Sequence, residues 1–125
     1  MKIALVFSGG STKVPLHIGS IKAIEESGIK PTSFYGTSAG AIIAACLAHG
    51  MNYEKLYKLA IKLDFNELLR GNFIDLLSSI SFVNGDKFYE FYDSIFGDLT
   101  FDTILHPCHI VGHCLNTYSY EVFNK

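Results

Sequence analysis

Short continuous apolar runs alternate along the chain with stretches in which apolar residues recur every three or four positions. The first run, residues 2–7, ends in the Gly-rich stretch of residues 8–10. A short apolar run bounded by turn residues is typical of a strand buried on both faces, so we predict a central parallel strand here. Residues 16–27 then show the periodicity of an amphipathic helix, which Gly28 is expected to end.

The same alternation continues to the end of the chain. Further strands are predicted at residues 32–35, 109–112 and 117–123, the last as an edge hairpin, and further helices at 39–49, 52–63, 85–96 and, in pieces, 65–80. Strands that alternate with helices predict an α/β fold: a mostly parallel sheet with helices on both faces. No linker or change of composition interrupts residues 1–125, so a single domain is expected.

Composition narrows the classes of function. The net charge of −2 gives no electrostatic case for nucleic acid binding. The apolar run at residues 3–7 is too short for a signal peptide or a membrane span, and the three cysteines lack the spacing of a metal site. We therefore expect a reduced, cytoplasmic setting, no metal and no organic cofactor, with Cys114 buried rather than reactive.

The most informative motif is Gly-Thr-Ser-Ala-Gly at residues 36–40. It has the form Gly-x-Ser-x-Gly of a nucleophile elbow, in which the serine lies on a sharp turn between a strand and a helix. Gly36 and Gly40 would let this turn close without a Cβ clash, and Ser38 would lie at a helix N-terminus, where partial positive charge favours an anion. The alternative is a Gly-rich turn whose serine only caps the helix.

A second Gly-rich stretch, Ser-Gly-Gly-Ser at residues 8–11, follows the first strand directly. Neighbouring parallel strands place their C-terminal loops side by side, so this loop and the elbow can converge on one site. Backbone N–H groups of Gly9, Gly10 and Ser11 would then form an oxyanion hole. A phosphate-binding loop is the alternative, but neither the Walker pattern nor Gly-x-Gly-x-x-Gly is present.

In their order and spacing these motifs resemble the patatin-like phospholipase family. The family opening is a strand, then Gly-Gly-Gly-x-(Arg/Lys)-Gly, then a helix similar to His-Ile-Gly-Val-Leu-Lys-Ala-Leu-Glu. Here residues 8–14 read Ser-Gly-Gly-Ser-Thr-Lys-Val, and residues 17–25 read His-Ile-Gly-Ser-Ile-Lys-Ala-Ile-Glu. Gly-Asp-Lys-Phe at residues 85–88 and Leu-Asn-Thr at 115–117 also resemble family segments, so the likeness runs the length of the chain.

The resemblance implies a three-layer fold and a lipid acyl hydrolase that works through a serine acyl-enzyme. Ser38 would be the nucleophile, and the substrate would be a fatty acyl ester of a phospholipid or neutral lipid. Lys13 fills the basic position of the family loop; its alternative role is that of a solvated surface lysine. Val14 replaces a family glycine, so we expect backbone strain if that position requires a positive φ.

The resemblance also implies a Ser–Asp dyad, with the aspartate in an Asp-Gly-(Gly/Ala) segment beyond the third strand. This chain contains no Asp-Gly, and every aspartate precedes that strand. We therefore expect a partial patatin-like domain, incomplete at its C-terminal side, whose open sheet edge a second copy or a partner chain covers. His113 is an alternative base. His109 and His113 are four apart in a predicted strand, so no shared metal is expected.

Two other functions remain open. A non-catalytic patatin-like fragment would bind lipid or a partner protein, and an acyltransferase would use the same acyl-enzyme intermediate. The aromatic residues between positions 65 and 101 have two readings as well. They would form core packing, or an apolar channel or face in peripheral contact with a membrane.

Overall fold

The computed structural model describes residues 2–62 and 85–124. The chain divides into two compact units, one of residues 1–60 with 100–125 and the other of residues 61–99. The first, here called the sheet unit, contains both Gly-rich motifs. The predicted helical stretch at residues 65–80 lies outside the described residues.

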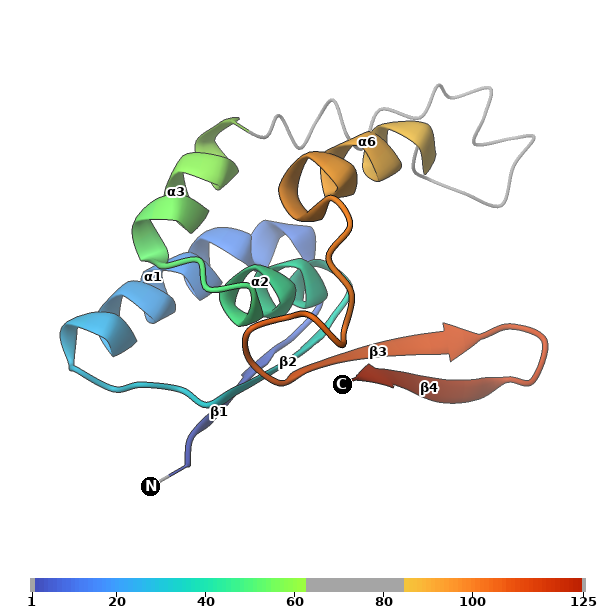
Figure 1. Ribbon diagram of the computed structural model, residues 1–125, viewed down its shortest axis with the longest axis horizontal. Coiled ribbons are helices and arrows are strands. Elements are labelled where there is room, and N and C mark those ends of the chain that lie inside the picture. Colours follow the sequence, from blue (N-terminus) through green and yellow to red (C-terminus); the bar gives the residue numbers. More distant parts are fainter. Residues whose placement is uncertain (1, 63–84, 125) are drawn as a thin grey trace. The chain divides into compact units, whose positions relative to one another are not determined.

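The sheet unit contains four strands in the order β1-β2-β3-β4 (Figure 1). These are β1 (Ala4–Phe7), β2 (Ser33–Thr37), β3 (Cys108–Cys114) and β4 (Ser119–Asn124). β1, β2 and β3 pair in parallel, and β4 returns antiparallel to β3 as an edge hairpin. The α/β class, the mostly parallel sheet and the hairpin are therefore confirmed.

Two helices cover one face of this sheet. Helix α2 (Ala39–Ala48) packs against β1, β2 and β3, and α1 (Val14–Glu26) packs against α2 (Figure 1). Seven of the ten residues of α2 are buried, because it packs against three strands and also contacts α1. The core between these layers includes Phe7, Ile21, Phe34, Ile43, Cys46 and Cys108.

The opposite face of the sheet carries exposed apolar side chains. Val6, Val111 and Val122 point to that face and are 76%, 37% and 55% exposed. β1 also lies at the edge of the described sheet, whereas a central position was predicted. The strand order β1-β2-β3-β4 also explains where the helices lie. Parallel crossovers are almost always right-handed, so helices that connect strands added in one direction lie on the same face of the sheet. In the sheet unit, α1 and α2 therefore lie on the same face of the sheet.

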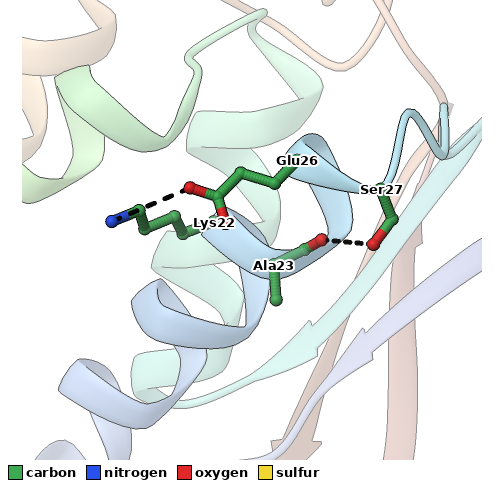
Figure 2. A network of polar contacts seen from close by, with 4 residues as sticks. All are labelled: Lys22, Ala23, Glu26 and Ser27. Atoms are coloured by element: carbon green, nitrogen blue, oxygen red, sulfur yellow. Dashed lines mark hydrogen bonds and ion pairs between the residues drawn. The ribbon is translucent and has the colours of Figure 1, made fainter.

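Helix α1 begins two residues earlier than its apolar pattern predicted, because Pro15 is accepted in the first helical turn. A short 3₁₀ helix, η1 (Ser11–Lys13), precedes it. The C-terminal end of α1 follows the prediction, since Gly28 takes a φ of +70° and its backbone N–H donates to the Glu25 carbonyl. Figure 2 shows the last turns of α1, where the Ser27 hydroxyl donates to the Ala23 carbonyl at 2.7 Å. In the same turns Lys22 Nζ forms an ion pair with Glu26 Oε1 at 3.8 Å.

Two further helices match their predicted positions. Helix α3 (Tyr53–Lys62) begins after Asn52, whose side-chain oxygen accepts the Lys55 N–H at 3.1 Å as an N-terminal cap. Helix α6 (Gly85–Phe96) belongs to the second unit and ends before Gly97, which has a φ of +50°. In the part of the chain that the structure describes, no helix has the length and apolar character needed to cross a membrane.

Candidate active site

Ser38 lies on the sharp turn between β2 and α2. Its φ of 53° and ψ of −130° are rare for a residue with a Cβ, and Tyr118 is the other described non-glycine residue with a positive φ. Holding such a backbone costs on the order of 1–3 kcal/mol, which the surrounding structure must offset. The turn leaves Ser38 exposed at the N-terminus of α2. This strand–turn–helix backbone is the geometry that a nucleophile elbow requires.

Gly36 and Gly40 let this turn close against the neighbouring strand. A Cβ on Gly36 would collide with the Gly40 carbonyl and lie 2.6 Å from its carbon. A Cβ on Gly40 would lie 2.6 Å from the Ser8 carbonyl oxygen and 2.7 Å from the Phe7 carbonyl carbon. Since real Cβ atoms essentially never come this close to backbone atoms, both positions require glycine.

The first Gly-rich loop runs directly beside the serine. A Cβ on Gly9 would lie 3.1 Å from Ser38 Cβ and 3.8 Å from Ser38 Oγ. Gly10 has a φ of +113°, a conformation that glycine adopts without strain. The two motifs lie 27 residues apart in sequence, from Gly9 to Gly36, and meet because β1 and β2 are parallel neighbours, with Phe7 opposite Gly36.

Lys13 and Val14 complete the loop. The Lys13 side chain covers Gly10, with its Cδ and Cε 3.3 and 3.4 Å from a Cβ built there, and its backbone N–H donates to the Gly10 carbonyl at 2.9 Å. Val14 is buried as the first residue of α1 and has no positive φ. The condition for strain at Val14 is therefore not met, because Gly10 takes the positive φ instead. Ser11 lies in η1, between Gly10 and α1.

Two helix N-termini point positive partial charge toward this region. α2 begins directly after Ser38, and α1 begins directly after the loop. The first N–H groups of a helix have no partner within it, so they favour an anion near the helix start. An exposed hydroxyl beside a glycine loop and a helix N-terminus is an arrangement that can stabilise the oxyanion of an acyl transfer.

The described residues do not provide a base for Ser38. Its side chain makes no capping hydrogen bond. His113, the alternative base, packs its ring against Tyr120 with centroids 5.2 Å apart, and His109 stacks on Tyr35 at 4.4 Å. Residues four apart on a strand share a face but lie about 13 Å apart, so these two histidines do not meet. In residues 2–62 and 85–124 no three His, Cys, Asp or Glu side chains are grouped to hold a metal.

The cysteines divide into two kinds. Cys46 and Cys108 are fully buried. The pKa of Cys46 is raised to about 12, chiefly by burial and to a smaller extent by the negative charge of Cys108. The prediction that Cys114 is buried is wrong: it lies half-exposed at the end of β3. A hydrogen bond from the Thr117 side chain is the largest cause that lowers the pKa of Cys114 below its ordinary value. The hairpin turn, which a sequence pattern does not specify, creates this environment.

Sequence reasoning assigned no role to His17 at the site. The His17 Nε2 atom lies 3.1 Å from the Ser8 carbonyl oxygen, directly before the Gly9–Gly10 loop. The available signal was its position: His17 falls on the apolar stripe of α1 between Val14 and Ile18, where an unpaired polar group would be unfavourable.

Comparison with known proteins agrees with this geometry. A model of the patatin-like phospholipase family matches residues 5–124. The chain belongs to this family. The patatin-like motifs quoted above all lie within the matched residues, including both glycine loops and Ser38.

Several proteins are similar in sequence to parts of this patatin-like chain. The uncharacterized protein YqhO of Bacillus subtilis is 40% identical over 78 residues, which are 61% of this chain and 27% of YqhO. Triacylglycerol lipase 5 of Saccharomyces cerevisiae is 39% identical over 67 residues, 52% of this chain and 9% of the lipase. Lysophospholipase nte1 of Aspergillus fumigatus is 33% identical over 98 residues, 77% of this chain and 6% of that enzyme. The chain thus matches a minor part of each relative's length.

Proposed function

We propose that this chain carries the nucleophile and oxyanion loop of a lipid acyl hydrolase that acts through a serine acyl-enzyme. The observation that supports the proposal best is the position of Ser38. It is exposed, it lies on a strained turn, and a Cβ on Gly9 would be 3.1 Å from its Cβ. A serine that only caps a helix would need neither the strained backbone nor the glycine loop beside it.

In this mechanism Ser38 Oγ attacks the acyl carbonyl carbon while a base takes its proton. Backbone N–H groups of Gly9, Gly10 and Ser11 hold the oxyanion, and the N-terminus of α2 adds its dipole. The intermediate collapses to an acyl-enzyme as the base gives its proton to the leaving oxygen, which departs as a neutral alcohol; water activated by the same base then releases the fatty acid and restores the Ser38 hydroxyl. The family resemblance assigns the base to an aspartate that the described residues do not supply, so that group would come from outside them. No metal or organic cofactor takes part.

The substrate class follows from the relatives and the loop. One relative is named a triacylglycerol lipase and another a lysophospholipase, so a fatty acyl ester of a neutral lipid or a phospholipid is proposed. Lys13 places a cation beside the loop, a position suited to the phosphate of a phospholipid. Peripheral contact with a membrane and a cytoplasmic location belong to the same proposal.

A second candidate is a non-catalytic patatin-like module that binds lipid or a partner protein. Two observations favour it: the described residues provide no base for Ser38, and the free sheet face exposes Val6, Val111 and Val122. A second copy or a partner chain along the outer edge of β1 would cover part of this surface. An acyltransferase is a third candidate, which an added alcohol acceptor would reveal as a new ester product.

The test is labelling with a fluorophosphonate, read by intact mass and peptide mapping. We expect one adduct, on Ser38, which Ser38→Ala abolishes. Ser20→Ala is the matched control because Ser20 is an exposed serine of the same unit whose hydroxyl donates to the Leu16 carbonyl. No adduct on folded protein, or equal turnover of a short-chain ester by the wild type and Ser38→Ala, would contradict the hydrolase proposal for this chain and favour the binding module.

A further inference from the structure

We propose that His17 is a positioning residue that fixes the glycine loop beside Ser38 from helix α1. The catalytic consequence rests on the proposed function; the positioning itself does not. His17 lies one turn into α1, on the stripe that buries Val14, Ile18 and Ile21. Its imidazole is half-buried, at the end of the helix nearest the loop.

The polar contact of His17 has a defined direction. Nε2 lies 3.1 Å from the Ser8 carbonyl oxygen. A carbonyl oxygen can only accept, so Nε2 must carry the hydrogen, and this contact selects the Nε2–H form of a neutral ring. The bond ties the last residue before Gly9 to a rigid helix.

The ring of His17 makes a second contact with the same junction. It meets the Phe7 ring edge-on, with centroids 5.4 Å apart and planes at 84°. Phe7 is itself 5% exposed at the end of β1. On the other side, the backbone of Phe7 and Ser8 abuts Gly40 of α2. The junction between β1 and the Gly9–Gly10 loop is therefore held between α1 and α2.

This restraint bears on the site because the loop is built from flexible residues. Gly9 and Gly10 have wide backbone freedom, and the described contacts fasten the loop at its two ends: Ser8 to His17, and Gly10 to the Lys13 N–H. Oxyanion donors act only when they lie within hydrogen-bond distance of the developing charge, and displacements of about 1 Å can cost 10²-fold in rate. Loosening the Ser8 end would thus weaken catalysis without touching Ser38.

Two substitutions separate the donor from the ring. His17→Gln keeps an N–H donor at a similar reach and loses the ring, whereas His17→Phe keeps a ring against Phe7 and loses the donor. We expect the backbone ¹⁵N order parameters of Gly9 and Gly10, measured by NMR, to fall from about 0.85 toward 0.6 in His17→Phe and to return toward the wild-type values in His17→Gln. Wild-type order parameters in His17→Phe would overturn the proposal.

The second measurement is the rate of fluorophosphonate labelling, with thermal unfolding recorded for each variant. We expect labelling of His17→Phe to fall about tenfold or more and His17→Gln to recover most of the rate, although both variants lose the native imidazole. Equal losses in the two variants that follow their unfolding temperatures would mean a merely structural role and would overturn the proposal. If the wild type itself is not labelled, the hydrolase proposal fails for this chain, and the order parameters of Gly9 and Gly10 still decide the positioning role.

Discussion

Replacing Gly40 with alanine tests how closely the elbow and the first loop must approach. The added Cβ would lie 2.6 Å from the Ser8 carbonyl oxygen and 2.7 Å from the Phe7 carbonyl carbon. Both atoms belong to backbone, which cannot rotate away as the end of a side chain would. The Phe7 carbonyl oxygen is nearer still, and an ordinary contact begins at 3.4 Å, so the start of α2 and the end of β1 must separate by at least about 0.8 Å.

That separation acts on stability and on the site at once. Overpacking of this kind typically costs about 1–3 kcal/mol of folding free energy. Because Ser38 moves with α2 and Gly9 moves with the end of β1, the same shift pulls the hydroxyl from the loop, and a displacement near 1 Å can cost about 10²-fold in rate. We therefore expect Gly40→Ala to lose labelling of Ser38 far out of proportion to its loss of stability.

The assay compares the rate of fluorophosphonate labelling with urea unfolding in Gly40→Ala and Gly19→Ala. Gly19 is the matched control, since it is a helical glycine of α1 with no atom within 4 Å of an added Cβ. Alanine there should stabilise the protein by about 0.5–1 kcal/mol and leave labelling unchanged. Wild-type labelling and stability in Gly40→Ala would refute the reasoning, because the close approach would then not exist in solution.

Two further predictions concern strain and burial. Because Ser38 has a φ of 53°, the free energy of unfolding, measured with urea, should be about 1 kcal/mol higher in Ser38→Gly than in Ser38→Ala. At Ser20, inside α1, the alanine variant should instead be the more stable one. The same order at both sites would argue against strain at Ser38. Burial raises the pKa of Cys46 from 9.0 to about 12, so its contribution to stability is complete below pH 9 and is lost as pH rises toward 12. The urea midpoint of unfolding should therefore fall between pH 9 and pH 11, and it should fall less in Cys46→Ala. A parallel fall in the wild type and Cys46→Ala would assign the loss to other groups. Iodoacetamide at pH 8 should modify Cys114 before Cys46.

The chain's own sequence determined its local elements and the turns that end them. Helix α1 ends just before Gly28 and α6 begins at Gly85, as predicted, because capping and backbone freedom depend on a few adjacent residues. The Gly-x-Ser-x-Gly pattern likewise placed Ser38 between a strand and a helix. The closeness of the two glycine loops was also predictable, since parallel strands joined by a helix bring their C-terminal ends together.

Tertiary structure decided what depends on partners distant in sequence. A continuous apolar run such as residues 2–7 does not reveal how many neighbours its strand has, so the edge position of β1 followed only from the strand order. Val14 is unstrained because Gly10 supplies the positive φ, and His17 faces Ser8 because α1 packs beside the end of β1. Periodicity assigns each residue to a face, and only the packing of elements determines which atom that face meets.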